Sequence, residues 1–137
     1  MSRPSAALAA AVRQRARGRC EYCHFPEKHA ALSFEVEHVI PRKHGGTNTA
    51  GNLASACFYC NRYKGPNVAG IAMPGGAVTR LFHPRSDVWT EHFGWRGVLL
   101  EARSEIGSVT IDVLRMNQPN AVAVRQLLME EGLWSPR

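Results

Sequence analysis

Residues 20–23 have the sequence CEYC, and residues 57–60 have the sequence CFYC. These two stretches hold every cysteine of the 137-residue chain, and 33 residues separate them. Two residues between a pair of thiolates let both bind one ion, and two such pairs supply the four ligands of a closed tetrahedral zinc site. We therefore expect one structural Zn2+ ion, with the ligands Cys20, Cys23, Cys57 and Cys60.

The alternative for these cysteines is two buried or redox-active dithiols. A thioredoxin-like site needs a β-α-β pattern around the pair, which the sequence does not suggest. The stretch from Met1 to Ala16 does not favour a signal peptide, because Arg13 and Arg15 interrupt it and its apolar part is short. We expect a cytoplasmic protein with no membrane segment, in a reducing compartment that favours metal binding over disulfides.

The residues around the cysteine pairs follow helix and strand patterns. Pro4 and Gly18 suit the start and end of an N-terminal helix, along which apolar residues recur at helical spacing. The patterns that follow predict a strand over 34–39, a flexible loop over 45–51 (GGTNTAG), a strand over 52–57 and a helix over about 58–64. The resulting order is strand, loop, strand, helix.

The remainder of the chain predicts further elements. Residues 65–79 are rich in Gly and Pro and favour a linker or wrapping loop. Beyond it we expect strands over 90–95 and 98–102, and helices over about 108–116 and 119–131. The whole pattern predicts an α+β protein with one domain over 1–137. Its core covers about 18–66, and a C-terminal extension at about 80–132 holds a β-hairpin plus helices.

The charge is unevenly distributed. Residues 1–85 hold 12 Lys or Arg against 4 Asp or Glu, whereas residues 86–137 hold 5 against 7. Between Val36 and Arg85, Glu37 is the one acid among six basic residues. Such clustering indicates either a side that faces a polyanion or an ordinary basic surface, and charge alone does not separate the two.

A second set of residues lies between and just after the cysteine pairs. It comprises Glu37-His38-Val39-Ile40-Pro41, Gly45-Gly46, Asn52-Leu53, Asn61 and Lys64-Gly65. Together with the cysteines, this set resembles the core of the HNH endonuclease family, which has the same elements in the same order. Downstream, residues 80–85 (RLFHPR), Trp89, His92-Phe93, Trp95 and Leu114-Arg115-Met116-Asn117 are similar to a stand-alone bacterial branch of that family.

The resemblance implies a small ββα-metal core stapled by zinc, and metal-dependent hydrolysis of phosphodiester bonds in DNA that is double-stranded and possibly nicked. It implies that His38 activates water, that Glu37 and Asn61 hold a catalytic divalent ion, and that Asn52 braces the loop and orients His38. The expected products carry a 5′-phosphate and a 3′-hydroxyl. The acid is Glu37 where Asp is commoner in the family, and the last position of the motif is Asn61 rather than His.

The chemistry of these side chains can also be argued without the family. A neutral histidine is a suitable base near pH 7. Carboxylate and amide oxygens are ligands for Mg2+ or Mn2+, which relieve the charge of a phosphate during hydrolysis. Neighbours on a regular strand point to opposite faces. Glu37 and His38 therefore serve one site only if the strand ends or bulges there.

The candidates for contacts with DNA phosphates are Arg42, Lys43, Arg62 and Lys64, which flank this set. Two other functions remain open. A non-catalytic, zinc-stapled nucleic-acid-binding module would keep the cysteines and the basic segment, but it has no need of the acid, histidine and asparagines together. A structural interaction domain would dock through the acidic C-terminal helices and has no need of the basic segment.

Overall fold

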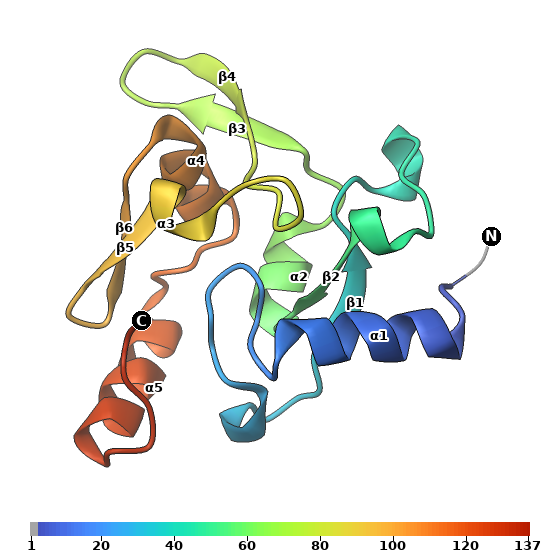
Figure 1. The fold of residues 1–137 in the computed structure, drawn as a ribbon. Helices are drawn as coiled ribbons and strands as arrows, with labels where there is room; N and C mark the ends of the chain where they lie inside the picture. Colours follow the sequence, from blue (N-terminus) through green and yellow to red (C-terminus); the bar gives the residue numbers. More distant parts are fainter. Residues whose placement is uncertain (1–2) are drawn as a thin grey trace.

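The structure is a computed structural model, and it describes residues 3–137. Short elements alternate along the chain (Figure 1). The helices are α1 (Ala6–Ala16), α2 (Phe58–Lys64), α3 (Trp89–His92), α4 (Glu105–Val113) and α5 (Pro119–Glu130). The strands are β1 (Glu35–His38), β2 (Leu53–Ala56), β3 (Ala69–Ala72), β4 (Ala77–Arg80), β5 (Phe93–Arg96) and β6 (Leu99–Ala102). The 3-10 turns are η1 (Glu27–His29), η2 (Arg42–His44) and η3 (Ala50–Asn52).

The core expected from the sequence is present as β1, β2 and α2. β1 and β2 pair in antiparallel register, with Glu37 opposite Ala54 and His38 opposite Leu53. α2 begins and ends where the sequence pattern places it, because Cys57 caps its first turn and Gly65 follows its last residue with a positive φ of 49°. The strand–loop–strand–helix order is therefore confirmed.

α1 is fixed to this hairpin by two arginines. The Ser5 side chain caps α1 by accepting a hydrogen bond from the backbone N–H of Leu8. Arg13 donates to the carbonyl of Phe34 at 2.8 Å, and Arg15 donates to the carbonyl of Leu53 at 2.7 Å. These bonds place the end of α1 next to both strands, so the first cysteine pair follows at a defined position.

Residues 65–79 do not form the expected linker. They contain most of an antiparallel hairpin, β3–β4, in which Gly70 pairs with Thr79. Its strands are rich in small residues because β3 packs closely on α4: a Cβ on Gly70 would lie 2.9 Å from a methyl of Val113. The glycine that resembled a loop signal in the sequence is thus a packing requirement of a strand.

Two boundaries in the C-terminal extension also differ from the sequence prediction. Thr90 belongs to α3, and β5 begins only at Phe93. The next helix starts at Glu105 rather than near 108, because the Ser104 hydroxyl accepts the N–H of Gly107 at 3.0 Å and caps it there. The last helix is close to its expected bounds and has Pro119 in its first turn.

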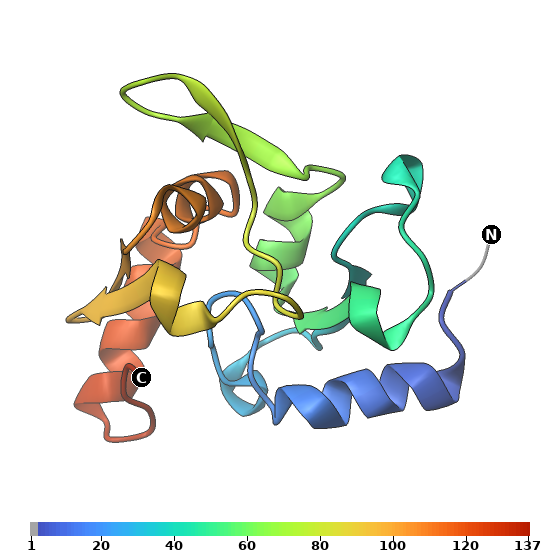
Figure 2. The ribbon, with the colours of Figure 1, turned by 45° about the horizontal axis from the view of Figure 1, so that its top comes forward.

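The extension packs against the core through the first cysteine pair. The Trp89 indole donates to the carbonyl of Tyr22 at 2.8 Å, and Arg85 pairs with Glu21. Figure 2 shows α4, α5 and the β5–β6 hairpin on one side of α2, with α1 and the loops around η2 and η3 on the other. Within residues 3–137, no helix has the length and apolar composition that crossing a membrane would require.

Candidate functional site

The four cysteines meet in one buried cluster. Their sulfur atoms all lie within 4.8 Å of one another, and the Sγ atoms of Cys23 and Cys57 are 3.8 Å apart. A tetrahedral zinc with Zn–S bonds of about 2.3 Å requires sulfur atoms about 3.8 Å from each other. The distance is too long for a disulfide, and all four thiols are free. The cluster therefore has the donor set and the spacing of a structural zinc site.

Local backbone structure places both halves of the cluster. In the first pair, the N–H of Cys23 points at the sulfur of Cys20 at 3.5 Å. In the second, Cys57 is the N-cap of α2, and its sulfur accepts the N–H of Cys60 at 3.4 Å. A hydrogen bond from the Cys20 thiol lowers the pKa of the Cys23 thiol well below its ordinary value. The pKa values of the Cys57 and Cys60 thiols are raised instead, mainly by their hydrogen bonds with Cys20, so the contacts favour the metal-binding thiolate form at Cys23 in particular.

Glu37 points from β1 into the interior beside the cluster. The Tyr22 hydroxyl donates to Glu37 Oε2 at 2.6 Å, and the Lys64 ammonium lies 3.1 Å from Glu37 Oε1. Burial raises the pKa of Glu37, and the opposite charge of Lys64 counteracts the shift. Both carboxylate oxygens thus have a partner from the protein.

His38 is the last residue of β1 and is half-buried. Its Nε2 atom lies 2.6 Å from Oδ1 of Asn48, in the loop between the two strands. Because an amide oxygen only accepts, Nε2 carries the hydrogen, and the neutral ring keeps its lone pair on Nδ1. The Asn48 contact therefore fixes both the orientation and the tautomer of the imidazole.

The strand ends at His38, but it does not bulge there. Glu37 and His38 pair in regular register with consecutive residues of β2, so their side chains point to opposite faces. Asn61 lies on α2, which packs against β1, and it shares a helix face with Lys64, three residues on. Glu37 and Asn61 thus come from facing elements, whereas His38 leaves β1 on the other face.

The Asn52 side chain is hydrogen-bonded to the backbone of the loop between the two strands. Its Oδ1 accepts the N–H of Ile40 at 2.9 Å, while its Nδ2 donates to the carbonyls of Ile40 and Thr47, both at 3.0 Å. Gly46 passes so close that a Cβ there would overlap the Ile40 carbonyl. The hydrogen bonds of Asn52 and the close approach of Gly46 therefore hold the base of the loop that carries Asn48.

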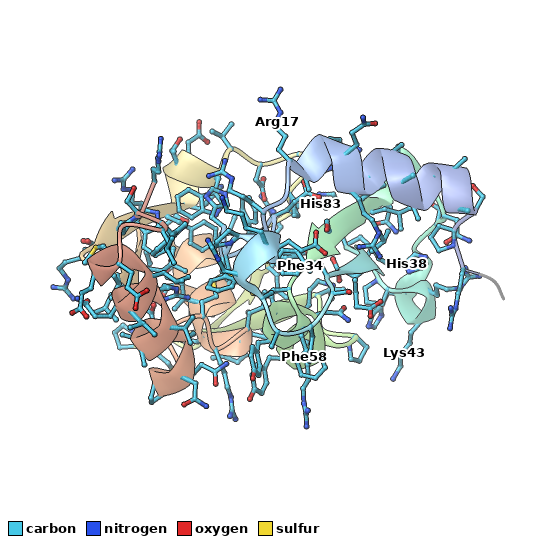
Figure 3. The ribbon with its side chains drawn as sticks, turned by 90° about the horizontal axis from the view of Figure 1, so that it is seen from below. Arg17, Phe34, His38, Lys43, Phe58 and His83 are labelled. Carbon is cyan, nitrogen blue, oxygen red and sulfur yellow. The ribbon has the colours of Figure 1, made fainter. Side chains whose placement is uncertain are left out.

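The four basic candidates do not lie together. Arg42, Lys43 and Arg62 are exposed, but the side chain of Lys64 is only 1% exposed. Lys64 Nζ pairs with Glu37 and donates to the carbonyl of His38 at 3.1 Å, so it does not lie on the surface expected to meet DNA. Figure 3 shows Lys43 and Phe58 extending from one side of the molecule and Arg17 from the opposite side.

Two residues that sequence reasoning missed complete the site. Tyr22 lies between the first two cysteines and holds Glu37, while Asn48 lies in the GGTNTAG loop and holds His38. The one signal for Tyr22 was its place inside a cysteine pair. Asn48 had none, because an asparagine is common in any polar loop.

Comparison with known proteins adds one match. Residues 20–67, from the first cysteine to just beyond α2, match the family model described as HNH endonuclease. No curated protein matches the chain.

Proposed function

We propose, from the match of residues 20–67 to the HNH endonuclease family model, that this protein is a metal-dependent endonuclease that hydrolyses DNA phosphodiester bonds. The observation that carries the proposal is the contact of His38 Nε2 with Asn48 Oδ1 at 2.6 Å, in a histidine that directly follows the acid Glu37. A histidine whose tautomer is fixed presents one defined ring nitrogen as the proton acceptor, which suits a general base.

In this proposal, His38 accepts a proton from the attacking water through Nδ1, since Nε2 is directed at Asn48. Asn48 then stabilises the imidazolium that forms, because its amide oxygen faces the ring N–H. Asn52 keeps the loop that carries Asn48 in place through its three backbone contacts. Asn48 and Asn52 are thus positioning residues: they hold His38 and its loop in place and are not proposed to contact DNA.

The catalytic divalent ion is assigned to Glu37 and Asn61. A carboxylate and an amide oxygen fit Mg2+ or Mn2+, and the two residues lie on the facing elements β1 and α2. When bound, such an ion relieves the charge on the phosphate. Lys64 supplies the positive charge beside Glu37 in the structure, so the ion and the ammonium compete for one carboxylate.

Zinc on the four cysteines has a structural part in this scheme. A site closed by four protein ligands leaves no position for water or substrate. The two pairs join the end of α1 to the start of α2, so the ion holds the helix that carries Asn61 against the first knuckle. The exposed Arg42, Lys43 and Arg62 are proposed to contact phosphates of DNA.

One observation favours a second function, a zinc-stapled nucleic-acid-binding module without catalysis. Glu37 and His38 face opposite sides of β1, and Lys64 neutralises Glu37. A binding module would keep this ion pair for stability alone and would hydrolyse nothing.

A plasmid-nicking assay in Mg2+ or Mn2+ separates the two functions. His38→Ala should reduce the nicking rate by about 10²–10⁴-fold while the zinc content and DNA affinity persist. His44→Ala is the matched control, because His44 is an exposed histidine in η2 and should nick at the wild-type rate. Equal nicking by wild type and His38→Ala would refute the general base, and binding without nicking by the wild type would establish the binding module.

A further inference from the structure

α2 has two faces with different compositions. The inward face carries the zinc-site cysteines together with Asn61 and the buried Lys64. The outward face consists of residues at positions i, i+1, i+4 and i+5, which form one stripe on a helix. This aromatic–arginine stripe is Phe58, Tyr59, Arg62 and Tyr63. Tyr59 is 48% exposed and Arg62 is exposed, so the stripe is open to solvent.

Two arginines are held on the rings of this stripe. The Arg62 guanidinium lies 5.8 Å from the centroid of the Phe58 ring, and that of Arg115 lies 4.9 Å from the centroid of Tyr63. Neither arginine takes part in any of the ion pairs found among residues 3–137. Their charges are therefore available to an anionic partner.

A cavity of about 250 Å³ opens beside the stripe. Phe58 and Tyr59 form one wall, Leu32 and Met116 contribute apolar side chains, and Arg115 also lines it. His29 lines the cavity too, and its Nε2 atom is buried with no hydrogen-bond partner. Because almost no accessible surface remains on that nitrogen, the cavity offers a ligand its apolar wall rather than a hydrogen bond from His29.

We propose that the aromatic–arginine stripe and this cavity bind an unpaired strand of the nucleic-acid substrate. A base stacks on Tyr59 at the mouth of the cavity, and the phosphates lie near Arg62 and Arg115. This inference rests on the proposed nuclease function and names its substrate class. The substrate is DNA that carries unpaired bases, such as a flap, gap or bubble.

The physical argument for an unpaired strand is the kind of surface that the stripe presents. In a duplex, the flat faces of the bases are stacked inside and only their edges are accessible. Aromatic rings instead recognise the flat face of a base, which contributes roughly 5- to 150-fold in affinity per base. Arginines beside such rings add attraction for phosphate, and Lys43 extends from the same side of the molecule (Figure 3).

The test compares the affinities of a short single strand and of a duplex of the same length, by fluorescence anisotropy without added divalent metal. We expect Tyr59→Ala to weaken single-strand binding by roughly 5-fold or more and to leave duplex binding nearly unchanged. Arg62→Gln should reduce the salt dependence of single-strand binding. Arg17→Gln is the matched control, since Arg17 is exposed on the opposite side and should change neither affinity.

A 2-aminopurine base in the single strand reports stacking directly. Its fluorescence should be quenched by the wild type and not by Tyr59→Ala, with thermal unfolding showing that the variant is folded. The inference is overturned if Tyr59→Ala weakens both ligands equally, or if the variant dissociates a dimer, which would make the stripe a contact between two copies. Plasmid nicking is scored separately. If the protein nicks plasmid but its single-strand binding does not depend on Tyr59, only the strand-binding inference is wrong. If it stacks bases but never nicks, only the proposed nuclease function is wrong.

Discussion

The ammonium of Lys64 lies 3.1 Å from Oε1 of Glu37, and both side chains are buried. Each charge has further partners: Lys64 donates to the carbonyl of His38, and Tyr22 donates to Glu37. The pair joins the last turn of α2 to β1. Removal of only one partner would leave the other charge buried without its counterpart, which is destabilising.

The first prediction is a double-mutant cycle on this pair. Lys64→Met and Glu37→Gln should each lower the free energy of unfolding by about 3–5 kcal/mol, because each leaves one buried group without its partner. The double variant should cost less than the two single costs added together. Urea unfolding of zinc-loaded protein measures this, with Lys28→Met as the exposed control. Additive single costs would show that the pair is not coupled.

The cycle also has a pH dependence of known sign. Burial raises the pKa of Glu37 in the folded state, and Lys64 opposes the shift. In Lys64→Met the opposing charge is gone, so the folded protein takes up the proton more readily than the unfolded chain. The deficit of this variant should therefore shrink as the pH falls through the raised folded-state pKa. A deficit that grows on acidification would contradict the burial of Glu37.

The second prediction concerns the metal. Purified protein should contain one zinc per chain, and Cys57→Ser should lose it and unfold at lower temperature. Serine is itself a good N-cap, so this substitution preserves the cap of α2 while it removes a thiolate. Elemental analysis and thermal unfolding are the measurements. If the purified protein contains no zinc and is folded with unchanged stability, the zinc prediction is wrong and the four cysteines are buried thiols without a metal.

The third prediction uses two glycines of one loop. Gly46→Ala should open the loop and lower both stability and nicking, because a Cβ there collides with the Ile40 carbonyl and with the Asn52 amide. Gly51→Ala is the matched control, since nothing lies within 4 Å of a Cβ at that position. Similar behaviour of the two variants in thermal unfolding and plasmid nicking would show that the loop adapts.

The fourth prediction tests Asn48 as a positioning residue. Asn48→Ala should slow nicking without loss of fold, because His38 loses the acceptor that fixes its ring. Asn48→Asp should move the acidic limb of the pH–rate profile to higher pH, since a carboxylate at Nε2 favours the imidazolium. An unchanged profile in Asn48→Asp would mean that Asn48 does not face His38 during catalysis.

The fifth prediction separates surface from buried cations. Lys43→Ala and Arg62→Ala should each reduce the slope of log affinity against log salt by about 1, because each removes an exposed cation that is proposed to contact a DNA phosphate. Lys64→Met should leave that slope unchanged in protein that is still folded, since its ammonium is inside. A loss of slope in Lys64→Met would mean that Lys64 leaves Glu37 when DNA binds.

The sequence predicted the parts whose signals are local. The cysteine spacing indicated the cluster, and the glycine and proline after Lys64 marked the end of the helix expected over about 58–64. The family resemblance implied that Asn52 braces the loop and orients His38; its hydrogen bonds to the loop backbone fit the first part, and its role in catalysis stays a prediction.

The parts that were missed depend on the path of the chain. The sequence of a short basic helix is the same whether its lysine faces solvent or a buried carboxylate. Only the packing of α2 on β1 determines that Lys64 faces Glu37. In the sequence, Gly70 indicated a loop; in the structure, it is the strand residue that lets α4 pack closely. Asn48 reaches His38 across ten residues, a contact that no periodicity encodes.

The length of α2 has one more consequence. An inserted or deleted residue turns every later position of a helix by about 100° and shifts it by about 1.5 Å. In a helix of only seven residues, such a change after Cys60 would turn Asn61, Tyr63 and Lys64 away from their present directions at once. We therefore expect this helix to tolerate substitutions along its outer side, but no change of length.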